Sequence, residues 1–78
     1  MKELLDYILK GVTGNDNFNI ESKEEGETTT FTVSVDSEQM GLVIGKGGNT
    51  IKAIQTLARI RGGLEGKSVF VNVVESSN

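Results

Sequence analysis

The segment from Gly41 to Ile51, which reads GLVIGKGGNTI, gathers four glycines and a lysine between apolar residues. Glycine lets the main chain approach a ligand closely or adopt a positive φ, because no side chain is in the way. Lys46 in this segment and Lys52 just after it add positive charge to a chain whose formal net charge is −3. Bare backbone N–H groups beside positive charge are what phosphate groups bind, so this segment is a candidate phosphate-binding loop.

The segment does not match the glycine-rich loops of phosphate-binding enzymes. In a Walker loop, Gly41 and Gly45 would be one residue too close, and Gly47 stands where a hydroxyl residue would ligate magnesium. A dinucleotide fingerprint needs a third glycine where this chain has Thr50, and it needs a preceding strand, whereas a helix is predicted here. The spacing therefore argues against both an NTPase and a dehydrogenase.

The segments around this loop predict a small set of helices and strands. The first 13 residues predict a helix, with Leu4, Leu5, Ile8, Leu9 and Val12 on one stripe. Residues 17–35 predict a hairpin, because TTTFTVSV alternates strictly and Gly26 suits a turn. Helices flank the loop over residues 37–62, and VFVNVVE predicts a strand at 68–75, followed by a frayed tail at 76–78.

This order, α-β-β-α-α-β, predicts a single α+β domain over residues 1–78. We expect a three-stranded sheet with the helices packed on one face, and the helical pair before the last strand permits parallel pairing in it. Asp36 or Ser37 is expected to cap the helix before the loop, and Gly41 to let that helix pack closely. Ile54 and Leu57 are expected in the core. Phe70 and Val74 should lie on the sheet face away from the helices, where they are candidates for a partner surface.

The loop and its flanks supply the candidate binding residues. The helix after the loop begins with unpaired N–H groups at the positive end of its dipole. Lys46 and Lys52 add charge, and Ile44 and Ile51 offer an apolar floor for bases. The candidates are Ile44, Gly45, Lys46, Gly47, Gly48, Asn49, Ile51 and Lys52, with Val43, Arg59 and Lys67 as additional candidates. The alternative for the glycines is a tight turn without ligand, and for the charges a solvated surface.

The stretch VIGKGGNTI resembles the KH-domain signature V-I-G-x-x-G-x-x-I. The element order resembles the type II arrangement, which implies that the three-stranded sheet is mixed. MKELLDYIL and IKAIQTLARIRG are similar to the small stand-alone bacterial KH proteins. The resemblance covers nearly the whole chain and implies a G-x-x-G loop, here Gly45-Lys46-Gly47-Gly48, that clamps single-stranded RNA or DNA over about four nucleotides. It also implies pairing with a larger bacterial protein that carries a KH domain.

Composition narrows the remaining function classes. The 78 residues include no cysteine and no histidine, so thiolate metal sites and the commonest general base are absent. We expect no enzyme activity, no cofactor and no metal. The N-terminus has no continuous apolar run, which predicts a soluble cytoplasmic protein without a membrane segment.

Charge is divided unevenly along the chain. Residues 1–40 carry three basic and nine acidic side chains, a net of −6, whereas residues 41–78 carry five basic and two acidic ones, a net of +3. The positive half contains the glycine loop, which favours an anionic partner there. The sequence thus predicts binding of single-stranded RNA with low sequence specificity. The alternative is an interaction module that forms a homodimer or pairs with a larger KH protein.

Overall fold

The computed structural model describes residues 2–15 and 17–76. Its elements follow the predicted order α-β-β-α-α-β, with a short 3₁₀ turn inserted at the glycine loop. They are α1 (Lys2–Thr13), β1 (Phe18–Glu25), β2 (Thr28–Val35), α2 (Ser37–Ile44), η1 (Lys46–Gly48), α3 (Asn49–Leu64) and β3 (Ser68–Glu75). Met1, Asp16 and residues 77–78 lie outside the described residues.

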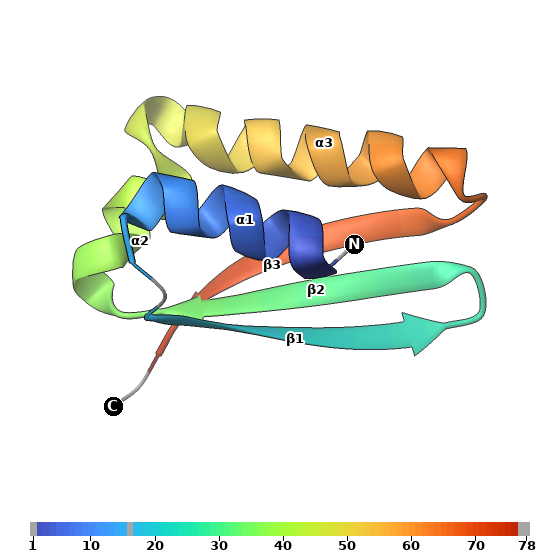
Figure 1. Cartoon of the computed structure of the whole chain (residues 1–78), viewed down its shortest axis with the longest axis horizontal. Coiled ribbons are helices and arrows are strands. Elements are labelled where there is room, and N and C mark those ends of the chain that lie inside the picture. Colours follow the sequence, from blue (N-terminus) through green and yellow to red (C-terminus); the bar gives the residue numbers. More distant parts are fainter. Residues whose placement is uncertain (1, 16, 77–78) are drawn as a thin grey trace.

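The three strands form one mixed sheet in the order β1-β2-β3 (Figure 1). β1 and β2 are antiparallel, with Phe18 opposite Val35 and Glu25 opposite Thr28. Gly26 adopts a φ of 61° in the turn between them. β3 runs parallel to β2, with Thr28 opposite Ser68, because α2 and α3 carry the chain back to the start of the sheet. The predicted mixed sheet is confirmed.

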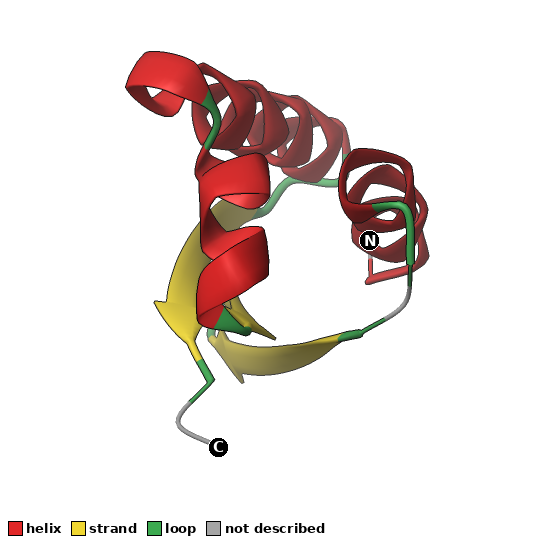
Figure 2. Cartoon of the chain, turned by 90° about the vertical axis from the view of Figure 1, so that its left-hand side faces the viewer, coloured by secondary structure: helices red, strands yellow, loops and turns green. Residues whose placement is uncertain are grey.

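The helices cover one face of this sheet and leave the other face open (Figure 2). The core lies between the two layers, and strand alternation supplies Phe31, Val33 and Val35 to it from β2. The remaining buried apolar residues come from every other helix and strand: Leu5, Leu9, Ile20, Val43, Ile54, Ala58, Val69 and Val71. Phe70 is 57 % and Val74 41 % exposed, as expected for residues on the open sheet face.

The end of α3 differs from the sequence prediction. The helix does not stop at Gly62 and Gly63 but continues to Leu64, and the chain turns at Gly66, where φ is 72°. Gly62 is buried because the helix packs tightly on β3 at this point. A Cβ there would lie 3.1 Å from both the Lys67 carbonyl oxygen and the Cβ of Val69. This glycine serves close packing rather than helix termination.

The expected frayed tail also differs at its first residue. The N–H of Ser76 donates to the Val35 carbonyl at 2.6 Å, so strand pairing continues one residue past Glu75. The other two residues of the expected tail lie outside the described ones.

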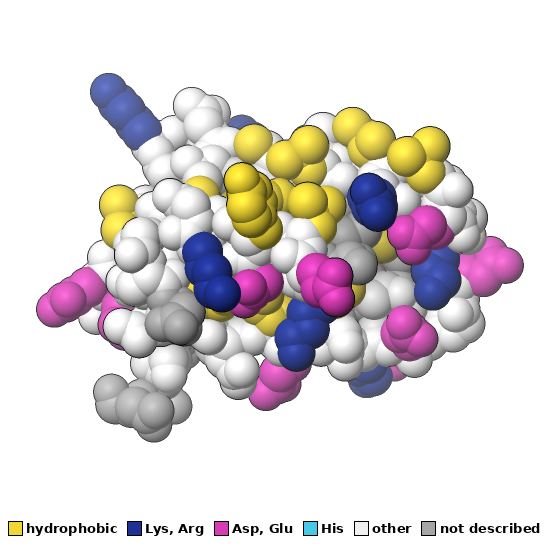
Figure 3. All heavy atoms as spheres, in the orientation of Figure 1, with side chains coloured by type: hydrophobic (Ala, Val, Ile, Leu, Met, Phe, Trp, Pro, Cys, Tyr) yellow, Lys and Arg dark blue, Asp and Glu magenta, His cyan; other side chains and the backbone are white. Residues whose placement is uncertain are grey.

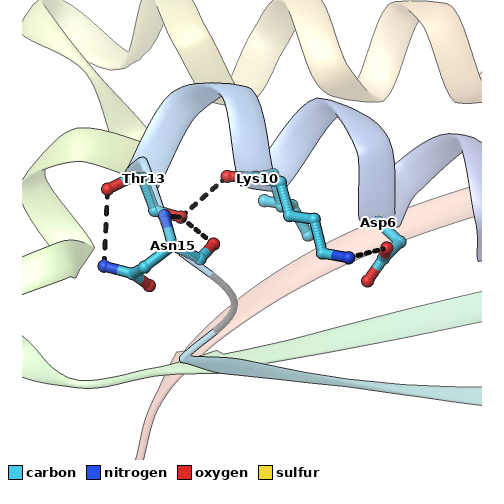
Figure 4. Close-up of polar contacts among 5 residues, drawn as sticks. Asp6, Lys10, Thr13 and Asn15 are labelled. Atoms are coloured by element: carbon cyan, nitrogen blue, oxygen red, sulfur yellow. Dashed lines mark hydrogen bonds and ion pairs between the residues drawn. The ribbon is translucent and has the colours of Figure 1, made fainter.

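Polar contacts fix the connection after α1 and, through it, the position of α2. The Thr13 hydroxyl lies within donating distance of the carbonyl oxygens of Leu9 (2.8 Å) and Asn15 (2.9 Å), which share its one hydrogen. Lys10 pairs with Asp6 at 3.1 Å (Figure 4). The Gln39 side chain donates from Nε2 to Asn15 Oδ1 at 2.9 Å. This bond links α2, the helix that leads into the glycine loop, to the end of α1.

Helix length and polarity bear on membrane insertion. Within residues 2–15 and 17–76, no helix is long and apolar enough to span a bilayer.

Candidate nucleic-acid interface

The helix that precedes the loop has well-defined ends. Asp36 is the N-cap of α2, and its Oδ1 accepts the N–H of Gln39 at 3.0 Å. At the other end, the N–H of Gly45 donates to the Gly41 carbonyl at 2.8 Å. Gly41 itself is exposed, and a Cβ at that position would meet nothing within 4 Å. The expectation that Gly41 allows close helix packing is therefore wrong.

Three glycines with positive φ shape the loop between α2 and α3. Gly45 has φ 77° and ψ 171°, a region that is essentially restricted to glycine. Gly47 and Gly48 lie in the left-handed region, with φ values of 64° and 77°. Gly45 also lacks space for a side chain, because a Cβ would overlap the Thr50 side chain and lie 2.9 Å from the Thr50 nitrogen.

The tip of the loop is open on the outside. A Cβ on Gly47 would meet nothing within 4 Å, and Lys46 and Gly47 are both exposed. Gly48 is the N-cap residue of α3 and cannot cap with a side chain, and none of the described side chains caps the helix in its place. The N–H groups of Gly48 and Asn49 already donate to the carbonyls of Gly45 and Lys46, so this end of α3 attracts an anion through the positive end of its dipole rather than through those two donors. Lys52, one turn into α3, is exposed.

Apolar side chains flank this positive centre unequally. Ile44 is 37 % exposed at the end of α2, and Ile51 is half-buried in the first turn of α3. Val43, by contrast, is completely buried in the core, so its side chain has no surface to offer a ligand. The inclusion of Val43 as a contact residue is wrong, and its role is to hold α2 on the core.

The two additional cationic candidates lie farther along the chain. Arg59 lines a small cavity between α3 and β3, about 15 Å along the helix axis from Asn49 at 1.5 Å per residue. Lys67 follows the far end of α3, which is about 24 Å long by the same rise. The structure therefore groups Ile44, Asn49, Ile51 and Lys52 around the loop, but it separates Lys67 from them.

Two residues of α3 have positions that sequence reasoning missed. Gln55 lines the same cavity as Arg59, and its Nε2 donates to the Val71 carbonyl of β3 at 3.0 Å. The sequence signal for this position is the spacing of Gln55, three residues after Lys52 and four before Arg59, which places the three side chains on one side of the helix. Leu57, expected in the core, is 49 % exposed. Fewer residues of α3 are buried than its apolar spacing predicts, because only Ile54, Ala58 and Gly62 of this helix are buried.

The arrangement lacks the groups needed for metal chemistry. Across the described ranges 2–15 and 17–76, no three His, Cys, Asp or Glu side chains converge on one point. The loop instead combines the positive end of a helix dipole, two lysines and an apolar border. That combination can hold a phosphodiester strand without breaking any bond in it.

Comparison with known proteins gives relatives that align over almost the whole chain. RNA-binding protein KhpA of Listeria monocytogenes is 36 % identical over 76 residues, which cover 96 % of this chain and 100 % of the relative. RNA-binding protein KhpA of Thermotoga maritima is 37 % identical over 76 residues, which cover 95 % of this chain and 99 % of the relative.

A solved structure resembles the fold. A crystal structure of Aquifex aeolicus Era superposes with a TM-score of 0.67 at 19 % identity, and the match covers 94 % of this chain and 29 % of that chain. At this identity the likeness concerns the fold alone.

The family comparison is more specific than the structural one. The family described as KhpA/KhpB, KH domain matches residues 2–73, which include the whole loop and both helices that flank it. Together with the relatives, this match shows that the chain belongs to the KhpA/KhpB family of KH-domain proteins.

Proposed function

We propose that this protein binds single-stranded RNA, without catalysis and with low sequence specificity, through the loop Gly45–Gly48. One observation carries the proposal: three positive-φ glycines lead directly into a helix N-terminus that no described side chain caps. The relatives in Listeria and Thermotoga are named RNA-binding proteins, which supports the same class of ligand.

The phosphate part of the binding site consists of backbone and lysine. Phosphates are attracted to the start of α3 by the positive end of the helix dipole, which contributes about 0.3–1 kcal/mol per anion at an exposed site. Lys46 at the loop tip and Lys52 in the first turn add direct charge. Bare glycine backbone lets the strand come close to these charges.

The base part of the binding site is aliphatic. Residues 36–64 contain no aromatic residue, so the loop and its helices provide no ring on which a base could stack. Ile44 and Ile51 offer apolar contact that every base can use. Phosphate contacts carry no sequence information, and such a site therefore discriminates weakly among bases. Single-stranded DNA presents the same phosphates, so we expect it to bind as well.

A salt titration tests this function. With two or three phosphate contacts, the slope of log K against log salt should be about −1.4 to −2, at roughly −0.7 per contact for a single strand. The measurement is the affinity for an unstructured RNA octamer, by fluorescence anisotropy, over a series of salt concentrations. A slope near zero would contradict binding through the loop, because apolar binding releases no counterions.

A second function, pairing with another KH domain, is supported by an exposed apolar surface. Leu57, Ile60 and Leu64 follow one another at i, i+3 and i+7 on α3 and are 49 %, 57 % and 81 % exposed. Tyr7 of α1 is 79 % exposed, and apolar side chains gather over α1 and α3 in Figure 3. We refer to Tyr7, Leu57, Ile60 and Leu64 as the α1/α3 patch.

The patch and the loop use different sides of α3. At 100° per residue, Leu57 lies roughly 140° around the helix from Lys52. Charged pairs border the patch, with Asp6–Lys10 on α1 and Arg61–Glu65 on α3, which resembles the polar rim of an interface. Two KH domains that meet through this patch would leave both glycine loops accessible. The proposed partner is a second copy of this chain or the KH domain of a larger family member.

A further inference from the structure

The outer edge of β3 presents backbone groups that none of the described strands uses. Ser68 and Ser76 direct their N–H groups to Glu27 and Val35, at 2.9 and 2.6 Å. Since backbone groups of a strand alternate in direction, the even-numbered residues of β3 face β2. The odd-numbered residues Val69, Val71 and Val73 therefore turn their N–H and C=O groups outward.

One of these outward groups is occupied by a side chain of the same protein. Gln55 of α3 donates from Nε2 to the Val71 carbonyl oxygen at 3.0 Å. Both bonded residues line a cavity of about 210 Å³, together with Arg59, Val69, Phe70 and Asn72. Whole small molecules occupy cavities of about 300–1,000 Å³, so this space suits a single planar base better than a complete nucleotide.

The cavity lies in line with the phosphate-binding loop. Lys52, Gln55 and Arg59 fall at i, i+3 and i+7, so they share one side of α3, which begins at the loop. A strand whose phosphates bind at the loop would continue along this side, beside the edge of β3. A base from that strand can enter the cavity and meet the outward groups of Val71.

We propose that Gln55 is a specificity-determining residue that suppresses base reading at the edge of β3. Its amide holds the Val71 carbonyl, which is the acceptor that a base would otherwise use. This inference rests on the proposed function, since it concerns RNA bound at the same loop, and it supplies a physical reason for low sequence specificity.

The physical argument is competition for one acceptor. A base donor that reaches the Val71 carbonyl in the native protein must displace the Gln55 amide or share the oxygen with it, so the net gain is smaller than that of an unshared hydrogen bond. Without that amide the base gains a full hydrogen bond, which corresponds to about a three- to tenfold increase in affinity. Bases differ in their donors and acceptors, so this gain depends on the base, whereas phosphate contacts do not change.

The test compares Gln55→Ala with the native protein on four octamers: adenosine, cytidine, uridine and an abasic ribose-phosphate chain. We expect the variant to bind at least one base-bearing octamer about three- to tenfold more tightly and to widen the spread of Kd among the three. The abasic octamer should bind with an unchanged Kd. Equal changes for all four octamers, weaker binding of the base-bearing ones, or no change would each overturn the proposal.

Two further variants separate the hydrogen bond from other effects. Gln55→Met retains a long side chain without a donor and should reproduce the gain; a gain with Ala alone would assign the effect to bulk and overturn the proposal. Thr56→Ala is the matched control, because the exposed Thr56 hydroxyl donates to the Lys52 carbonyl of its own helix at 2.8 Å. Its base preference should equal that of the native protein.

Failure of this inference can be told from failure of the proposed function. If the double variant Lys46→Asp with Gly47→Asp, which reverses the loop charge, abolishes binding of all four octamers while Gln55→Ala leaves base preference unchanged, RNA binding at the loop stands and the role of Gln55 is rejected. If that double variant is folded and binds the octamers as tightly as the native protein, the proposed function itself is rejected.

Discussion

Among individual residues, Gly45 is the most tightly constrained. Its φ of 77° and ψ of 171° fall where other residues rarely occur, and Thr50 fills the space that a side chain would need. Gly47 has a positive φ as well, but open space surrounds it. The two glycines are therefore not equivalent, in agreement with the motif G-x-x-G, in which Gly45 is a fixed position and Gly47 a variable one.

This difference predicts unequal effects of alanine at the two positions. Gly45→Ala adds backbone strain of order 1–3 kcal/mol to overlap that costs about 1–3 kcal/mol. It should lower the free energy of unfolding by at least about 2 kcal/mol and weaken RNA binding by distorting the loop. Gly47→Ala should lower the free energy of unfolding by about 1–2 kcal/mol, because alanine is strained at a positive φ but meets no neighbouring atom there. Urea unfolding of both variants measures this order, and equal losses would contradict the strained geometry at Gly45.

At the scale of elements, α3 carries three separate roles on different sides. Ile54, Ala58 and Gly62 are buried on the side that faces the sheet, Gln55 bonds to the edge of β3, and the α1/α3 patch is exposed. Gly62, on the packing side, lets the helix lie close to β3, because a Cβ there would lie 3.1 Å from the Lys67 carbonyl oxygen.

Neighbouring glycines near the end of α3 provide a test of this packing. Gly62→Ala should destabilise the fold by about 1–3 kcal/mol, because its Cβ would press against Val69 and the Lys67 carbonyl. Gly63→Ala is the matched control, since its Cβ would meet nothing within 4 Å. That change should stabilise the helix by roughly 0.5–1 kcal/mol. Thermal unfolding of the pair distinguishes the two, and the same sign for both would mean that α3 does not pack on β3 as described.

The sequence predicted much of this level of structure and missed part of it for identifiable reasons. The strand TTTFTVSV alternates strictly, and Leu5 and Leu9 are four residues apart on a helix. Each pattern arises because one side of the element is buried, so the local sequence is enough to predict it. The exposure of Leu57 depends on how much of the α3 surface the sheet covers. The hydrogen bond of Gln55 depends on where β3 lies relative to α3 in the folded protein. Both are properties of tertiary packing, which local periodicity does not contain.

For the whole molecule, charge and apolar surface are distributed to different regions. The longest dimension is 35 Å, and the acidic turn between β1 and β2 lies at the opposite end from the glycine loop (Figure 1). At physiological salt the Debye length is about 8 Å, so the acidic end is screened from RNA at the loop. A net charge of −3 is therefore compatible with an RNA ligand.

The α1/α3 patch predicts association of whole molecules. Ile60→Glu places a charge at the centre of this patch, where burial against a partner would be costly, and should shift the protein toward monomer in sedimentation equilibrium. Phe70→Glu on the open sheet face is the matched control, because Phe70 and Ile60 are both 57 % exposed. Loss of association with Phe70→Glu but not Ile60→Glu would assign the interface to the sheet.

The central claim, that the loop Gly45–Gly48 holds RNA phosphates, is tested most directly by reversing its charge. Lys46→Asp with Gly47→Asp places two negative charges where phosphates would lie, and Lys46→Asn with Gly47→Asn imposes the same shape without charge. We expect the Asp pair to weaken RNA binding at least tenfold, about 1.4 kcal/mol, and the Asn pair to fall between it and the native protein. Circular dichroism should be unchanged, since both positions are exposed. A folded Asp pair that binds RNA as tightly as the native protein would contradict the claim.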